Sequence, residues 1–213
     1  MWEFIEDRRV QILTNAWNHA YLVILAVLFA TVIAIALAMV VTRLPKLEPV
    51  SNAVSAVGLT IPSFALIGLL LPFTGLGPPT ALLAVTFYAV LPILRNAVVG
   101  LAGVDPNLVE SARGMGMSEL ASMFRIRLPL AWPVILAGIR ISMQMSMGIA
   151  AIAAYVLGPG LGVGIFTGLA QIGGKNAVNE ALVGTLGIVL IALVLDALLL
   201  ALGRVTTSKG IRV

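Results

Sequence analysis

The sequence predicts an all-α, polytopic membrane protein, and three observations lead to this prediction. Of its 213 residues, 60% are hydrophobic and 10% are charged, whereas soluble domains carry about 25% charged residues. Five apolar stretches approach the length of about 20 residues that an α-helix needs to cross a membrane. The basic residues stand in short clusters between these stretches, as expected for membrane flanks and not for a surface that binds nucleic acid.

The five predicted spans cover about residues 20–42, 53–73, 79–94, 130–157 and 180–203. Proline is expected to break or kink the second span at Pro62 and the third at Pro92. Residues 158–179 are too rich in glycine for a full span. We expect them to form a loop on the outer face, with a short helix or re-entrant turn, and a sixth span is the alternative. The glycines of residues 158–179 would either allow close approach to another protein or make the segment a flexible connector.

The distribution of lysine and arginine predicts that the N-terminus lies outside the cell and the C-terminus in the cytoplasm. With this orientation, the outer segments hold three basic residues, Arg8, Arg9 and Lys175. The inner loops hold nine, which are Arg43, Lys46, Arg95, Arg113, Arg125, Arg127, Arg204, Lys209 and Arg212.

Residues 1–19 precede the first predicted span and carry an amphipathic pattern. Val10, Leu13, Trp17 and Tyr21 recur at helical spacing opposite polar residues, which is typical of a helix that lies in the membrane interface. An equally good interpretation is that the first span begins early. The acidic start of the chain is unlike the basic start of a signal peptide, so the first apolar run is expected to remain as an anchor.

The first span also carries a ridge of small residues. Ala26, Ala30, Ala34 and Ala38 fall on one face of the helix. Such a ridge predicts close contact with a neighbouring helix.

Residues 95–129 form the longest polar loop, which the charge distribution places in the cytoplasm. A short helix is expected from about 106 to 113, because Asp105 can cap its free N–H groups and proline suits its first position. Gly114 and Gly116 are expected to end this helix in the left-handed conformation. Ser118 is expected to cap a second short helix.

Such a loop has little hydrophobic area to bury on its own, so we expect a partner protein to stabilise it. Methionine and other apolar side chains suit contact with a partner helix or groove. The apolar candidates are Leu108, Val109, Met115 and Met117, and the polar candidates are Glu110 and Arg113.

The spacing of the loop residues resembles the EAA loop of permease subunits of bacterial ABC importers. That signature reads E-A-A, three residues, G, nine residues, and I-x-L-P. Ser111 stands where the signature has its first alanine, a small-for-small exchange. The matching positions are Glu110, Ala112, Gly116, Ile126, Leu128 and Pro129.

The resemblance implies a type I ABC importer permease fold with about five transmembrane helices in one domain, residues 1–213. It implies that residues 106–120 form a coupling helix that docks in a cleft of an ATP-hydrolysing subunit. The sequence lacks the phosphate loop G-x-x-x-x-G-K-[ST], so two partner ATPase subunits would bind the ATP, and this chain would be neither an enzyme nor a cofactor protein. The expected coupling residues are Leu108, Glu110, Ala112, Arg113, Gly114, Met115 and Gly116.

The resemblance extends to residues 59–72, 91–117 and 154–171, which are similar to the half-size permeases of osmoprotectant importers. It implies uptake of a compatible solute such as glycine betaine, choline or carnitine across a bacterial cytoplasmic membrane. An extracytoplasmic binding protein would supply most of the selectivity, and a second permease subunit, identical or homologous, would complete the path. The alternatives are a permease for another small solute, such as an amino acid, and an ion-coupled secondary carrier.

One stripe of the fourth predicted span is polar or small where a lipid-facing helix would be apolar. It contains Arg140, Gln144, Gly148, Ala151 and Tyr155 at helical spacing, and it should face protein or water. The candidate translocation path consists of Ser63, Gln144, Gly148 and Tyr155.

Two opposite charges are expected to meet inside the membrane. Arg140 and Asp196 lie at a similar predicted depth in the fourth and fifth spans, and an unpaired arginine there costs about 2.5 to 3.5 kcal/mol on insertion scales. We predict that they pair, as a lock between neighbouring helices or, alternatively, as part of a gate. Cysteine is absent, and no metal site is expected.

Overall fold

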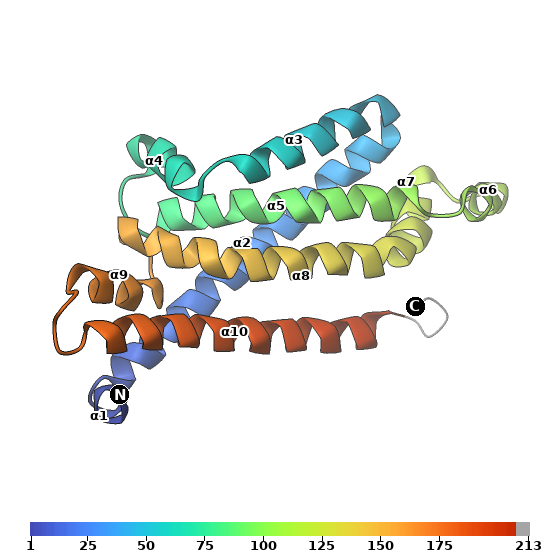
Figure 1. Ribbon diagram of the computed structural model, residues 1–213. Helices are drawn as coiled ribbons and strands as arrows, with labels where there is room; N and C mark the ends of the chain where they lie inside the picture. Colours follow the sequence, from blue (N-terminus) through green and yellow to red (C-terminus); the bar gives the residue numbers. More distant parts are fainter. Residues whose placement is uncertain (208–213) are drawn as a thin grey trace.

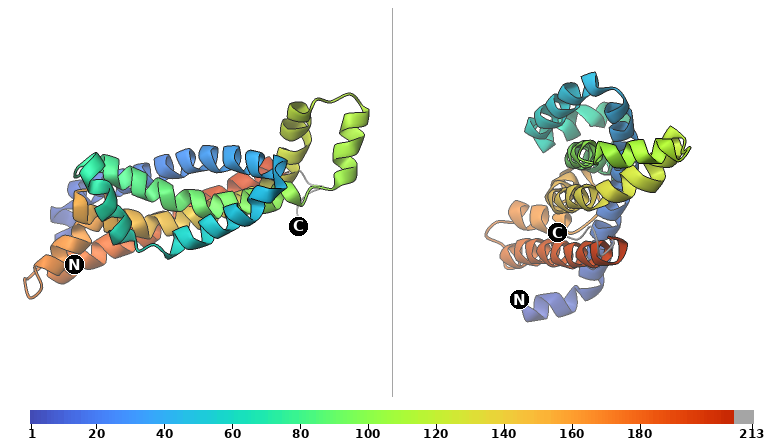
Figure 2. Two further views of the ribbon diagram at one scale, coloured as in Figure 1. Left: turned by 90° about the horizontal axis from the view of Figure 1, so that it is seen from above. Right: turned by 90° about the vertical axis from the view of Figure 1, so that its right-hand side faces the viewer.

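The computed structural model describes residues 1–207, and every regular element in this part of the chain is a helix (Figure 1). Three long helices lie side by side, α5 (Pro78–Ala102), α8 (Leu128–Ala153) and α10 (Ala177–Thr206), and α2 (Arg9–Arg43) crosses them obliquely (Figures 1 and 2). The shorter elements are α1 (Trp2–Asp7), η1 (Pro45–Leu47), α3 (Glu48–Thr60), α4 (Ser63–Thr74), α6 (Pro106–Gly114), α7 (Glu119–Ser122), η2 (Met123–Arg127), η3 (Ala154–Val156) and α9 (Gly162–Ala170).

The helices confirm the prediction of about five spans. Among the described residues, four helical segments are long and apolar enough to cross a membrane, and they are 9–43, 78–102, 119–156 and 177–206. The bent pair α3 and α4 would make a fifth if it counts as one span.

The second predicted span is not one straight helix, because α3 and α4 meet at an angle of 96°. Ile61 has an extended backbone directly before Pro62. Proline clashes with a helical residue before it and offers no N–H for a helical hydrogen bond. The hydroxyl of Tyr88 donates a hydrogen bond of 2.5 Å to the Ile61 carbonyl, so the break is stabilised by a side chain of α5.

The prediction was also wrong about where the polar loop begins, since α5 continues from the expected end at 94 to Ala102. The apolar face persists through Ala97, Val98 and Leu101, which are almost fully buried. Arg95 is exposed on the opposite side. Burial of one face therefore outweighs the polar residues, and the loop between the spans is shorter than expected.

The segment that follows α6 is helical without a break up to the end of the fourth predicted span. Instead of a separate second helix in the loop, residues 119–156 form one helical segment in which a π-helical stretch, η2, joins α7 to α8. The predicted cap is present, because the Ser118 hydroxyl accepts a hydrogen bond of 3.2 Å from the Ala121 N–H.

At the N-terminus the structure agrees with an early start of the first span. α2 runs without a break from Arg9 to Arg43 over 35 residues, which is about 52 Å at 1.5 Å per residue and exceeds the hydrocarbon core of about 30 Å. Only α1 is a separate helix, and the chain turns at Arg8.

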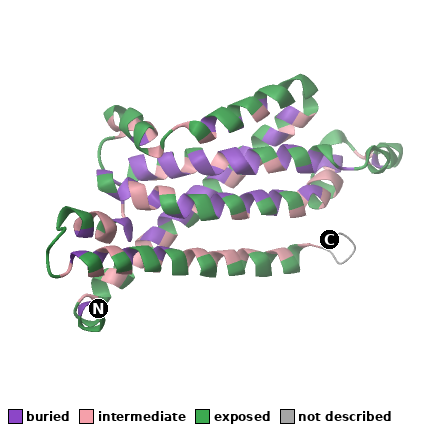
Figure 3. Ribbon diagram, in the orientation of Figure 1, coloured by how far each residue is buried: buried purple, intermediate pink, exposed green. Residues whose placement is uncertain are grey.

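The core lies around α5 and the sides of α2 and α8 that face it (Figure 3). All four members of the predicted alanine ridge on α2 are fully buried, which confirms that this face packs closely. By contrast, α10 is mainly exposed or half-buried in the isolated chain (Figure 3). A large part of its surface is thus left for lipid or another subunit.

The loop before α9 is closely packed and is not a flexible connector. A Cβ atom on Gly158 would lie 2.6 Å from the Ala153 carbonyl oxygen, and one on Gly162 would overlap the Ala151 carbonyl. Gly160 has φ +126° and packs against His19. With nine residues, α9 is about 13 Å long, too short for a sixth span, so a short helix is the correct alternative.

Candidate functional site

Helix α6 projects from one end of the bundle, opposite the end that carries α1 and α9 (Figures 1 and 2). Its start is built as expected, because Asp105 Oδ1 accepts a hydrogen bond of 2.8 Å from the Asn107 N–H and Pro106 occupies the first position. At nine residues the helix is too short to be stable alone. Its caps and its contacts with the following segment hold it in place.

Most of the predicted coupling residues are exposed, as a docking surface requires. Leu108 is 47% exposed and Met115 is 70% exposed, which is unusual for large apolar side chains in a segment outside the membrane. Ala112 is the exception, since it is fully buried against the chain's own fold. The other exposed members of the set are Glu110, Arg113, Gly114 and Gly116.

The two glycines of the loop have different roles. Gly116 has φ +81° and is the residue that takes the left-handed conformation, whereas Gly114 is the last residue of α6. The prediction that both end the helix in this way was therefore wrong for Gly114. No neighbouring atom lies within 4 Å of a Cβ built on either glycine, so the backbone conformation, and not space, favours glycine at 116.

A groove runs along α6 and is bordered by the end of α5 and by Arg127, the last residue of η2. It is lined by Val109, Glu110, Arg113 and Arg127, among others. The Nε of Arg127 is buried and has no hydrogen-bond partner among the described residues. The groove therefore presents apolar and charged side chains together, as the surface of a protein–protein interface does.

A second polar site lies between α8 and α10, within the membrane-spanning segments. Arg140 donates two hydrogen bonds of 2.9 Å, from Nε and Nη2, to the two carboxylate oxygens of Asp196. Gln144 adds a third to Asp196 at 3.3 Å. The structure thus brings the two predicted partners together in the bidentate geometry that is strongest for arginine and a carboxylate.

A further contact holds the same two helices together. Trp132 lies about one turn after the start of α8. Its indole N–H donates a hydrogen bond of 2.8 Å to the hydroxyl of Thr206, the last residue of α10. These polar contacts add to the apolar packing of α10, in which half-buried side chains such as Leu195 and Leu199 lie against the core.

The predicted translocation-path residues divide into two groups. Gln144 belongs to the ion-pair site, whereas Tyr155 lies about 16 Å further along the helical segment and touches the ring of Phe64, which follows Ser63. Gly148 lies between them and faces open space. Gln144, Gly148 and Tyr155 are all exposed in the isolated chain, so the polar stripe lies on the surface of the subunit.

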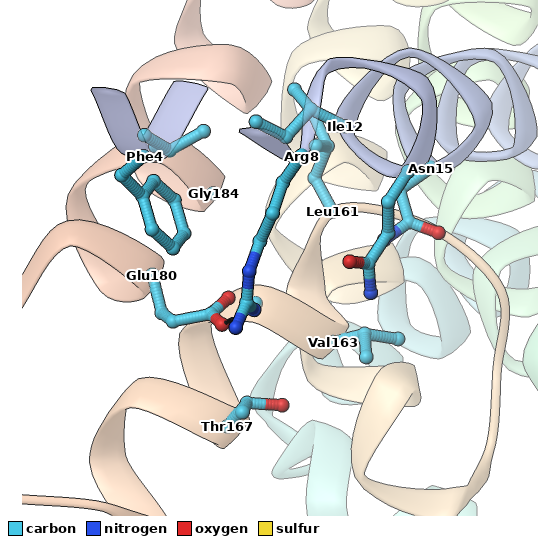
Figure 4. Close-up of a pocket in the computed structure, with 12 residues that line it drawn as sticks. Phe4, Arg8, Ile12, Asn15, Leu161, Val163, Thr167, Glu180 and Gly184 are labelled. Carbon is cyan, nitrogen blue, oxygen red and sulfur yellow. Dashed lines mark hydrogen bonds and ion pairs between the residues drawn. The ribbon is translucent and has the colours of Figure 1, made fainter. Parts of the chain in front are cut away.

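The opposite end of the molecule contains a pocket between α1, α2, α9 and α10 (Figure 4). Arg8 points into it and forms an ion pair with Glu180, and its guanidinium lies 5.0 Å from the centre of the Phe4 ring. Asn15 and Thr167 add polar groups to the lining. Sequence reasoning missed this site, although an acid in the first turn of the last apolar helix was a usable signal.

Replacing Arg8 with alanine is expected to loosen the N-terminal segment, because Glu180 would remain as a largely buried carboxylate without its partner. Arg8 itself is 41% exposed, so we expect a loss of only about 1 kcal/mol of stability. The loss of stability is measured by thermal unfolding of the purified protein in detergent. Arg9→Ala, at the exposed neighbouring position, should leave the unfolding temperature unchanged; equal effects of both variants would contradict a specific role for the ion pair.

Comparison with known proteins identifies relatives along almost the whole chain. Residues 26–207 match the family described as binding-protein-dependent transport system inner membrane component. The chain is 38% identical to the osmoprotectant import permease protein OsmW of Salmonella typhimurium, and the match covers 98% of each chain. It is 35% identical to the carnitine transport permease protein OpuCB of Listeria monocytogenes, over 98% of this chain and 94% of the relative.

The fold agrees with a solved structure. A chain of the MetNI methionine ABC transporter, in inward-facing conformations, superimposes with a TM-score of 0.80 at 23% sequence identity. The superposition covers 95% of this chain and 99% of that chain. At this level of identity the match establishes the fold alone.

An all-helical bundle of about five spans with a short exposed helix at one end defines a fold class, that of the type I ABC importer permeases. Within that class, the chain belongs to the family of binding-protein-dependent transport system inner membrane components.

Proposed function

We propose that the protein is the permease of an ATP-driven importer for osmoprotectants such as glycine betaine, carnitine or choline. The observation that carries this proposal is the full-length similarity to relatives named for these solutes. One of them, the glycine betaine/carnitine/choline transport system permease protein OpuCB of Bacillus subtilis, is 32% identical over 100% of this chain and 96% of its own length.

The proposed complex contains two ATPase subunits, and one of them binds α6 and the groove beside it. The exposed apolar side chains of Leu108 and Met115 and the polar lining of the groove support this assignment. The permease itself is then non-catalytic, and ATP is bound and hydrolysed by the partner subunits.

A second permease subunit, identical or homologous, would cover the polar stripe of α8 and enclose the path together with this one. The exposure of Gln144, Gly148 and Tyr155 supports this, because a polar stripe facing lipid is costly. Ser63, half-buried at the bend between α3 and α4, joins them in the proposed path.

The proposed orientation places α6 in the cytoplasm and residues 1–19 and 158–179 outside a bacterial cytoplasmic membrane. The N-terminal segment and the 158–179 loop lie at one end of the molecule and α6 at the other (Figure 1), which supports assigning them to opposite sides. Of the nine basic residues expected inside, Lys209 and Arg212 lie outside the described residues. An extracytoplasmic binding protein would deliver the solute to the outer end.

Reconstitution tests the function directly. The permease is placed in proteoliposomes with its ATPase subunits and binding protein, and uptake of radiolabelled glycine betaine, carnitine and choline is measured with and without ATP. We expect ATP-dependent accumulation of at least one of these solutes that excess methionine does not reduce. Inhibition by methionine would favour an amino-acid permease, and accumulation by the chain alone without nucleotide would favour a secondary carrier.

A further inference from the structure

Three aromatic rings from three separate elements meet at the end of the molecule opposite α6. Phe64 comes from the first turn of α4, Tyr155 from η3 and Phe166 from α9. The ring centres of Phe64 and Tyr155 are 5.6 Å apart with an interplanar angle of 83°, and those of Tyr155 and Phe166 are 5.4 Å apart at 58°. The rings therefore form one connected cluster with Tyr155 in the middle.

The cluster is open on one side. Tyr155 is 66% exposed and Phe64 is 50% exposed, whereas a ring that only fills the core would be buried. Tyr155 is also the last member of the stripe on which Gln144 and Gly148 lie. A solute that enters at this end and moves along the stripe meets the rings first.

The backbone holds Tyr155 firmly. Leu157 follows within two residues and has φ +62°, a conformation that costs a non-glycine residue energy and persists only where surrounding contacts enforce it. Those contacts are present, because the Gly77 N–H donates a hydrogen bond of 2.8 Å to the Val156 carbonyl and Gly158 packs against Ala153. The ring is thus presented on a fixed support.

The chemistry of the cluster fits a quaternary ammonium group. Such a group has no N–H to donate, so hydrogen bonding cannot recognise it, but its positive charge is attracted to the faces of aromatic rings within about 6 Å. Rings at a membrane surface also serve as interfacial anchors. A lipid anchor does not require two rings from separate elements to contact a third ring held on a rigid turn, as Phe64 and Phe166 contact Tyr155.

We propose that Phe64, Tyr155 and Phe166 form the permease's own entry site for the quaternary ammonium group of the solute, which they bind by cation–π interaction after the binding protein releases it. This proposal rests on the proposed function as an osmoprotectant importer. The proposed site adds a selectivity step within the membrane subunit. This step comes after the binding protein delivers the solute and before the solute passes along α8.

The test compares two substitutions at one position in the complete reconstituted importer. Tyr155→Leu keeps an apolar side chain but removes the ring, and uptake of glycine betaine at low concentration should fall about 2- to 30-fold. Tyr155→Phe keeps the ring and should restore most of the uptake. Phe166→Leu should lower uptake in the same direction as Tyr155→Leu. Phe73→Leu, at an 86% exposed phenylalanine of α4 outside the cluster, is the matched control.

Uptake is normalised to the amount of complex that copurifies with the ATPase subunits. Wild-type uptake per complex in Tyr155→Leu and Phe166→Leu would overturn the proposal, as would equal losses in Tyr155→Leu and Tyr155→Phe. Fewer assembled complexes with normal uptake per complex would assign the rings to membrane anchoring and would also overturn it. If Tyr155→Leu does not assemble with the ATPase subunits, the same measurements on Phe64→Leu test the proposal instead. If the wild-type importer takes up none of the three solutes, the proposed function itself fails.

Discussion

Gly116→Val is expected to reduce ATP-dependent uptake at least about tenfold while the protein still inserts into the membrane. The left-handed conformation of Gly116, with φ +81°, costs a β-branched residue roughly 1 to 2 kcal/mol or more. The turn after α6 would relax to another conformation and displace the exposed side chain of Met115. Because the proposed contacts between α6 and the ATPase depend on this geometry, we expect ATP hydrolysis to continue without driving transport.

Gly68→Val is the matched control for this experiment. Gly68 lies outside the loop, in α4, where it is helical and exposed, and a Cβ atom there has no neighbour within 4 Å, so valine should be accepted. Uptake and ATP hydrolysis are measured in the same proteoliposomes for both variants. Normal uptake by Gly116→Val would refute the coupling role of the loop and would favour the secondary-carrier alternative.

Arg140→Leu is expected to lower the yield and the thermal stability of the folded protein substantially. It leaves Asp196 as an unpaired carboxylate in a membrane-spanning helix, for which insertion scales suggest a cost of about 2.5 to 3.5 kcal/mol. Part of this cost is relieved because the aspartate side chain is 21% exposed. Membrane yield and the unfolding temperature in detergent measure the effect, and Arg95→Leu, at an exposed arginine of α5, is the control.

The double variant that exchanges the charges, Arg140→Asp with Asp196→Arg, separates pairing from other effects. It should recover much of the yield that either single change loses, because the ion pair can form again with reversed polarity. No recovery would contradict a specific pair between α8 and α10. If the recovered protein transports normally, the pair is a structural lock, and if it is folded but inactive, the pair belongs to a gate.

Local sequence signals were sufficient for much of the fold. The apolar runs located the spans because crossing a membrane sets a minimum helix length. Asp105 and Pro106 fixed the start of α6, since a cap acts on N–H groups only two or three residues away. The alanine ridge of α2 predicted a buried face because its four residues share one side of a helix.

Errors arose where burial against distant elements decided the outcome. α5 continues past Arg95 because its other face is covered, and Ala112 faces inward because α6 folds back against the following segment. The angle of 96° between α3 and α4 could not be read from Pro62 alone, since proline permits a range of bends and the contact with Tyr88 belongs to another helix.

The sequence by itself determined the membrane class, the approximate spans, the capped start of α6 and the need of Arg140 for an acidic partner. These properties follow from composition, from spacing within one helix and from the cost of an unpaired charge in lipid. Only the tertiary structure decided that Arg8 meets Glu180 and that Phe64, Tyr155 and Phe166 share one cluster. Such contacts join residues far apart in the chain, and their geometry depends on how whole helices pack.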